Sequence, residues 1–146
     1  MNESWTMVSA VSSAISALVV LAAAGYAAMQ VSELRKARGI QSLLSIHERY
    51  QSPSLNRIRR RLHAGQLDDV GRLTEVEGEQ LGDLLNQLEL ISVLVEHSLI
   101  DHELVWQLFP TIPKTIKQAM PFIQVRRQSN ARYALFSEKL AQSYQQ

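Results

Sequence analysis

The feature that most constrains this chain is a long uncharged segment near its start. No Asp, Glu, Lys or Arg occurs between Ser4 and Ser32. The apolar middle of the segment, Met7 to Met29, would measure about 34 Å as an α-helix at roughly 1.5 Å per residue. That length is enough to cross a hydrocarbon core of about 30 Å. We therefore predict that residues 1–32 form a transmembrane anchor, which makes the lipid bilayer the first expected partner.

Two other interpretations of this segment fit less well. A cleaved signal peptide normally carries positively charged side chains before its apolar region. Here the charged side chain before the apolar segment is Glu3, which is negative. A buried core helix of a soluble domain would be shorter and would usually keep a polar face. A retained, single-pass transmembrane helix agrees best with both the length and the charge pattern.

The residues that follow the segment predict its orientation. Arg35, Lys36 and Arg38 come directly after it, and Lys and Arg close to a membrane span are retained on the cytoplasmic side. We expect the N-terminus to lie outside the cell and the rest of the chain to lie in the cytoplasm.

Small residues recur at intervals of four within the predicted span. Ser9, Ser13 and Ala17 would share one helix face, and such stripes allow two helices to approach closely in lipid. A homo-oligomer or a larger membrane complex is therefore possible. Equally, Ala and Ser are tolerated in a span that has no partner helix.

Charge is strongly segregated along the remainder of the chain. Residues 35–63 contain eight Lys or Arg against one acid, residues 66–103 contain ten acids against one Arg, and residues 104–146 contain six Lys or Arg against one acid. Such a chain can neutralise much of its charge by folding on itself. This pattern makes nucleic acid an unlikely partner.

The segment after the span is patterned as helix throughout, so we predict an all-α fold. Residues 33–52 are expected to continue the membrane helix as a stalk, with Gly39 as a weak point in it. Pro53 ends the stalk because its ring disfavours helix in the preceding residues. Residues 53–146 are expected to form a small cytoplasmic helical bundle.

A short helix after Pro53 carries a cluster of arginines. Leu55, Ile58 and Leu62 are spaced as one buried face. The other faces carry Arg57, Arg59, Arg60 and Arg61. These arginines could contact an anionic surface of lipid or nucleic acid, or they could pair with the acidic segment that follows. The favoured interpretation is that the cluster is a solvated face or pairs internally with the acidic segment, since no aromatic platform or recognition module accompanies it.

The strongest predicted helix runs from Thr74 to about Ile100. Thr74 and Glu77 form a capping box, and apolar residues surround the helix almost completely from Leu88 onwards. A helix of that kind is buried by several neighbours, so we expect it to be the central helix of the bundle.

Polar residues on this central helix need partners if they are buried. Asn86 and Glu89 lie one turn apart on it. A last helix is predicted to begin at Pro121 and to run from Phe122 to about Ser143. Its Arg126 and Arg127 could reach the acidic central helix. We expect Glu89 to be largely buried and to bind Arg126 or Arg127, with Asn86 completing a structural polar cluster.

Short motifs in the second half resemble a bacterial family whose domain has no known function. They are Asn86-Gln-Leu-Glu89, Leu99-Ile-Asp101 and Pro121-Phe-Ile-Gln-Val-Arg126-Arg127. Members of that family are small proteins with one N-terminal transmembrane helix and a helical C-terminal domain. The resemblance implies this fold and a bacterial inner-membrane setting, and it implies no activity. It also marks Asn86, Glu89 and Arg126 as positions of interest.

Catalytic and metal-binding signals are weak. The chain has no Cys and hence no thiolate ligand or nucleophile, and no phosphate loop or nucleophile elbow occurs in it. His97 and His102 are five residues apart, which is a poor spacing for one helix face. We expect no metal, no cofactor and no catalytic residue.

Three classes of function remain open. The favoured one is a membrane-anchored interaction or regulatory subunit that acts through oligomerisation or a membrane partner. The second is a peripheral binder of anionic lipid or nucleic acid that uses Arg57 to Arg61. The third is a helical membrane-associated enzyme that uses Glu89 or the histidines.

Overall fold

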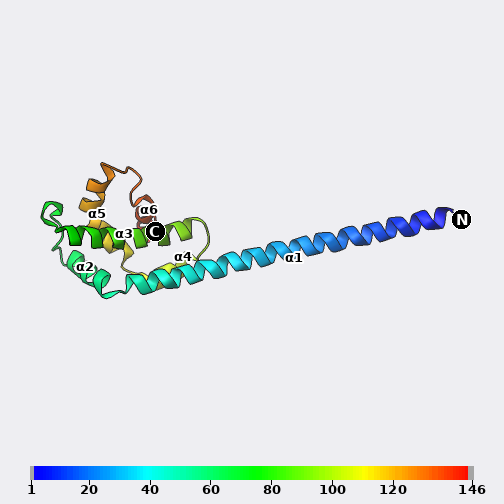
Figure 1. Ribbon diagram of the computed structural model, residues 1–146, viewed down its shortest axis with the longest axis horizontal. Coiled ribbons are helices and arrows are strands. Elements are labelled where there is room, and N and C mark those ends of the chain that lie inside the picture. The colour runs from blue at the N-terminus through cyan, green and yellow to red at the C-terminus, as the bar shows by residue number, and fades with distance from the viewer. Residues whose placement is uncertain (1, 145–146) are drawn as a thin grey trace. The chain divides into compact units, whose positions relative to one another are not determined.

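A computed structural model describes residues 2–144, and its side chains are described at residue 9 and from residue 11 onwards. Residues 1, 145 and 146 of the predicted anchor and bundle lie outside the described part. The described residues form an all-helical fold (Figure 1). The elements are α1 (Asn2–Tyr50), α2 (Pro53–His63), the short 3-10 helix η1 (Val70–Arg72), α3 (Glu75–Glu96), α4 (His102–Leu108), α5 (Ile112–Arg127) and α6 (Leu135–Ser143).

The chain divides into two compact units, Met1–Ala37 and Arg38–Gln146. In the first unit every described side chain is exposed. The exposed set includes large apolar residues, namely Val11, Ile15, Leu18, Val19, Val20, Leu21, Tyr26, Met29, Val31 and Leu34. Helix α1 is long and apolar enough to cross a membrane, which is compatible with a single-pass anchor.

The second unit includes the end of α1. Leu43, Ile46 and Tyr50 are buried in its core, so the second half of the predicted stalk belongs to the compact domain. Gly39 is buried as well. A Cβ atom at Gly39 would collide with the carbonyl oxygen of Leu99. Glycine is present here because it permits close backbone approach, and the predicted weak point is a packing contact.

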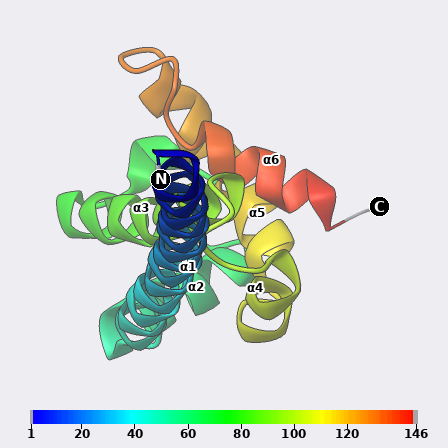
Figure 2. The same cartoon turned by 90° about the vertical axis from the view of Figure 1, so that its right-hand side faces the viewer.

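Four helices of this unit contact one another in the cyclic order α2, α3, α6, α5. Figure 2 shows the same helices in the turned view. Their inward faces carry the spacing of three to four residues that an amphipathic helix requires. The core that they share contains, among others, Leu55, Ile58, Leu62, Leu81, Leu84, Leu85, Leu88, Ile91, Ile116, Phe122, Ile123 and Leu140.

Aromatic contacts connect the end of α1 and helix α4 to this core. The Phe109 ring, which follows α4, meets the rings of His47 and Tyr50 edge to face at centroid distances of 5.2 and 5.1 Å. Trp106 of α4 stacks on Tyr144 at 4.3 Å. Such pairs stabilise a fold beyond the area that they bury, and here they join segments far apart in the sequence.

Two helix predictions for the C-terminal half are wrong. Pro121 lies inside α5 and does not begin a new helix. A proline leaves the carbonyl four residues earlier, here that of Lys117, without its helical hydrogen bond. Both residues are exposed, so water can bind this carbonyl instead. The predicted helix from Phe122 to Ser143 is interrupted between α5 and α6. There Ala134 adopts a left-handed conformation with φ 54°.

Helix α3 is less completely buried than its sequence predicts. Leu90 is 52% exposed, and Glu75, Glu79, Asp83 and Asn86 are also exposed. The helix therefore has one solvent face, although its other sides pack against α2 and α6.

Candidate functional site

Glu89 of α3 holds the start of α6. Its half-buried carboxylate accepts hydrogen bonds from the backbone N–H groups of Phe136 at 3.2 Å and Ser137 at 2.9 Å. It also accepts one from the Ser137 hydroxyl at 2.6 Å. The first N–H groups of a helix lack partners within the helix, and the residue before α6, Ala134, supplies no side-chain cap. Glu89 therefore caps α6 from a neighbouring helix, where its negative charge also matches the helix dipole.

The predicted partners of Glu89 lie elsewhere. Arg127 donates to Glu138 at 2.7 Å and to the Tyr133 carbonyl at 3.0 Å. Arg126 is exposed, with its guanidinium 5.2 Å from the centre of the Phe122 ring. Asn86 is exposed on α3. The predicted cluster of Asn86, Glu89, Arg126 and Arg127 is thus wrong in its pairing. Glu89 binds the start of α6, whereas Arg127 binds Glu138 and the Tyr133 carbonyl.

Tyr133 lies near the same charged groups. Burial raises the pKa of Tyr133, while Arg126 opposes this rise and Glu89 adds to it. The phenol therefore stays neutral at physiological pH. We interpret the surroundings of Glu89 as a polar interface that fixes α6 against α3 and α5.

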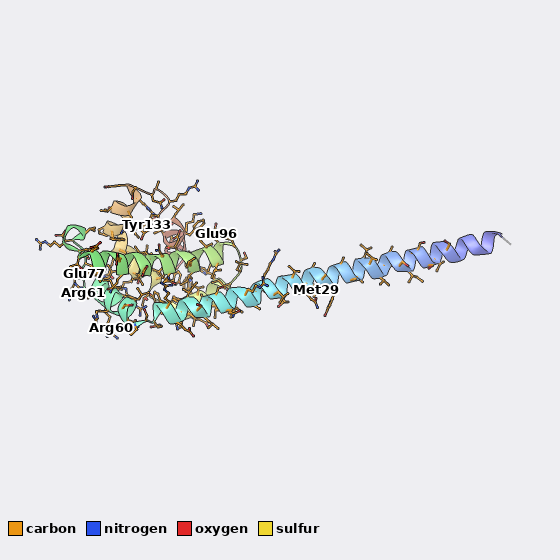
Figure 3. The ribbon with its side chains drawn as sticks, in the orientation of Figure 1. Met29, Arg60, Arg61, Glu77, Glu96 and Tyr133 are labelled. Atoms are coloured by element: carbon orange, nitrogen blue, oxygen red, sulfur yellow. The ribbon has the colours of Figure 1, made fainter. Side chains whose placement is uncertain are left out.

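Two of the four arginines on α2 are engaged within the domain. The Arg59 guanidinium lies 4.2 Å from the centre of the Tyr50 ring and also donates to Asn56. Arg61 forms an ion pair with Glu77 of α3 (Figure 3). Hydrogen bonds from the Thr74 backbone N–H and then from Arg61 lower the pKa of Glu77. The capping box predicted from Thr74 and Glu77 is present, so this pair joins α2 to the start of α3.

The other two arginines are available to an external partner. Arg57 and Arg60 are exposed, and within the described residues neither has a carboxylate within 4 Å. They line a shallow cavity of about 430 Å³ together with Pro53, Asn56 and Arg61. We call Arg57 and Arg60 the basic face of α2. The arginine cluster thus divides into an internal half and an exposed half.

A second cavity lies between the start of α3 and the end of α5, with a volume of about 420 Å³. We call it the α3–α5 cleft. Its apolar lining is formed by Val70, Leu73, Phe122 and Val125, and its polar lining by Thr74, Glu75, Glu79 and Arg126, with Gly78 between them. Glu75 and Glu79 are exposed and one helical turn apart. The cleft therefore combines an apolar wall with two free carboxylates.

The histidines occupy separate environments. His63 of α2 lies 2.9 Å from the Thr115 hydroxyl of α5, and His102 lies 2.7 Å from the Ser143 hydroxyl. His97 is exposed at the end of α3. Among the residues searched, no three His, Asp or Glu side chains gather closely enough to hold a metal ion.

A profile of the family described as "Domain of unknown function (DUF4760)" matches residues 11–144. This match covers the exposed apolar helix and the whole bundle as far as the end of α6. The chain belongs to the DUF4760 family. No curated protein and no solved structure matches it.

Sequence reasoning about this DUF4760 chain found the basic face of α2 but missed the α3–α5 cleft. Glu75 and Glu79 carry the spacing of neighbours on one helix face, which is a usable signal. Their proximity to Phe122 and Val125 depends on how α5 packs, and helix spacing alone does not determine that packing. The prediction that Pro121 starts a new helix also placed Phe122 in the wrong element.

Proposed function

We propose that this DUF4760 protein is a single-pass protein of a bacterial inner membrane whose helical domain serves as an interaction or regulatory subunit. The observation that carries the proposal is the exposed apolar surface of α1. Large side chains from Val11 to Met29 are 56–69% exposed. An exposed apolar surface of this extent needs a covering, and a bilayer covers every side of a helix at once.

The orientation follows from the charges beside the helix. Arg35, Lys36 and Arg38 are exposed and follow the apolar segment directly, which favours retention of the following domain in the cytoplasm. In this orientation the bundle, with its basic face and its α3–α5 cleft, faces cytoplasmic and membrane-bound partners. We infer that binding of such partners, or of further copies, is the task of the domain.

The anchor is tested by disrupting it inside the full-length chain. Membranes that contain the protein are washed with alkaline carbonate, which releases proteins that do not span the bilayer. The parent should stay in the pellet at full length. A variant with Leu18→Arg and Leu21→Arg should be released, because an arginine at the centre of a span costs about 2.5–3.5 kcal/mol on the insertion scale.

A matched control places the same charges at the end of the span. Gln30→Arg with Ser32→Arg should remain membrane-bound, since a long side chain near a span end reaches the interface. Release of the parent, or its appearance as a shortened soluble protein, would contradict the anchor. The interaction role is tested by cross-linking in intact membranes before purification, and recovery of the protein without any cross-linked species would contradict that role.

A further inference from the structure

Two charged surfaces of the bundle that border cavities have opposite signs. Arg57 and Arg60 are exposed on α2 without a carboxylate within 4 Å, whereas Glu75 and Glu79 are exposed on the rim of the α3–α5 cleft. Neither carboxylate has a Lys or Arg within 4 Å among the described residues. Arg61, which lines the same cavity as Arg57 and Arg60, is already paired with Glu77 of α3. Arg57 and Arg60 are therefore complementary in charge to Glu75 and Glu79, and none of these four has an ion-pair partner within 4 Å among the described residues.

The α3–α5 cleft has the chemistry that an arginine side chain needs. The methylene stem of arginine packs well against apolar surface while its guanidinium stays polar. The exposed Val125 and the half-buried Val70 and Leu73 supply such a surface. The guanidinium can pair with a carboxylate through two parallel hydrogen bonds. Glu75 and Glu79 offer carboxylates at the edge of that surface. One arginine, Arg126, already lies along Phe122, and it leaves the two glutamates unpaired.

We propose that the basic face of α2 docks into the α3–α5 cleft of a second copy of this chain. The contact joins two different surfaces, so a two-fold arrangement makes it twice in a closed dimer, and any other rotation gives a head-to-tail ring or row of copies. Because each copy carries both surfaces, one protein supplies the complete pair. The inference rests on the proposed membrane-bound interaction role and names a second copy as one partner of the domain.

A contact made of a few exposed ion pairs is weak in dilute solution. Two copies held in one membrane by their anchors meet at a much higher effective concentration, which converts weak contacts into substantial occupancy. The same physics makes the contact sensitive to salt, because exposed charges are screened over about 10 Å at 0.1 M ionic strength. The association should therefore occur in membranes and weaken as salt increases.

The experiment uses the absence of cysteine from the sequence, which gives a cross-linking assay without background. One tagged full-length copy carries Ala64→Cys, on the same side of α2 as Arg57 and Arg60. A second copy with a different tag carries Gly82→Cys, one turn beyond Glu79 on α3, where a Cβ meets nothing within 4 Å. A short bismaleimide added to membranes should link the two tags. A control pair of Ala64→Cys with Gln142→Cys, on α6, should not be linked.

Charge reversal then tests the chemistry of the contact. Arg57→Glu with Arg60→Glu in both copies should reduce the linked fraction about tenfold, and Glu75→Arg with Glu79→Arg should do the same. Linking should return when a copy with the acidic α2 meets a copy with the basic cleft. The neutral variants Arg57→Gln with Arg60→Gln, and Glu75→Gln with Glu79→Gln, should give intermediate values and confirm that the effect does not come from misfolding.

Several outcomes would overturn the inference. One is a linked fraction that does not change with salt or with charge reversal. Another is that a copy with the acidic α2 and a copy with the basic cleft fail to regain linking. A third is that the protein is linked only to other proteins. In each of these cases the carbonate result decides the membrane role separately, so a failed self-contact and a failed anchor are distinguishable.

Discussion

The carboxylate of Glu89 accepts two hydrogen bonds from Ser137, one from its backbone N–H at 2.9 Å and one from its hydroxyl at 2.6 Å. Ser137 is completely buried, so water cannot replace the carboxylate as its partner. Because Ser137 lies in the first turn of α6, this pair attaches the last helix of the DUF4760 domain to α3.

Replacing Glu89 by Ala should therefore destabilise the domain. The change leaves the buried Ser137 hydroxyl without its acceptor, which costs about 1–3 kcal/mol, and removes a helix cap, which is worth about 0.5–2 kcal/mol. We expect a loss of about 2–3 kcal/mol in the free energy of unfolding, measured by denaturant titration of the detergent-solubilised protein. The rate of amide hydrogen exchange in α6 should rise by the factor that corresponds to this loss of free energy.

Asp83 provides a control on the same helix. It is exposed, and Asp83→Ala should change the free energy of unfolding by about 0.5 kcal/mol or less. Equal stability of Glu89→Ala and the parent, together with the loss of a measurable binding or cellular activity, would contradict the capping role and would place Glu89 in a functional site instead.

The case of Glu89 shows where sequence reasoning about this chain succeeded and where it could not. The spacing of apolar residues identified α3 and the polarity of Glu89 marked it as a residue in need of partners. Those partners are two backbone N–H groups and one hydroxyl of α6, which become available because the chain breaks its helix after Arg127. The segment between α5 and α6 contains no Gly or Pro that would have predicted the break. Ala134 in it takes a left-handed conformation that alanine rarely adopts. Tertiary packing decides such a position.

The α2 arginines illustrate the same limit. The sequence correctly placed a charged cluster next to an acidic segment, and it favoured either a solvated face or pairing with that segment. In the structure Arg61 alone of the four pairs with it, through Glu77. Arg59 instead lies on Tyr50 at the end of α1, a contact between segments whose proximity no local pattern encodes.

His63 should make the stability of the domain depend on pH. Burial lowers its pKa from the ordinary value of 6.5, and the charges of Lys114 and Arg59 lower it further. The unfolded chain therefore binds a proton at His63 more readily than the folded chain. Stability from this group is complete above about pH 6.5 and is lost as the pH falls from there through the lowered pKa.

The variant His63→Gln isolates this contribution. Glutamine can still donate to the Thr115 hydroxyl, which His63 contacts at 2.9 Å, but it does not titrate. Between about pH 7.5 and about pH 5.5 the variant should lose less stability than the parent, and the carboxylates common to both proteins cancel in the comparison. Identical pH profiles for the two proteins would contradict this assignment.

The orientation in the membrane gives a further prediction. Reporter enzymes fused after Gln146 should be active if they require the cytoplasm and inactive if they require the periplasm, because Lys and Arg beside a span favour its cytoplasmic side and Arg35, Lys36 and Arg38 follow this one. Changing all three to Ser should reduce this preference. Activity of the periplasmic reporter in the parent fusion would reverse the proposed topology.

Gly39 offers a test in which two physical effects have opposite signs. In an unhindered helix, replacing Gly by Ala stabilises by about 0.5–1 kcal/mol. At Gly39 the new Cβ would collide with the Leu99 carbonyl oxygen, so α1 or the turn after α3 must shift. Since overpacking a core costs about 1–3 kcal/mol, we expect Gly39→Ala to lower the free energy of unfolding. Gly82→Ala on α3, where the Cβ meets nothing within 4 Å, should raise it. Stabilisation by both substitutions would show that α1 does not pack against Leu99 and that Gly39 only weakens the helix.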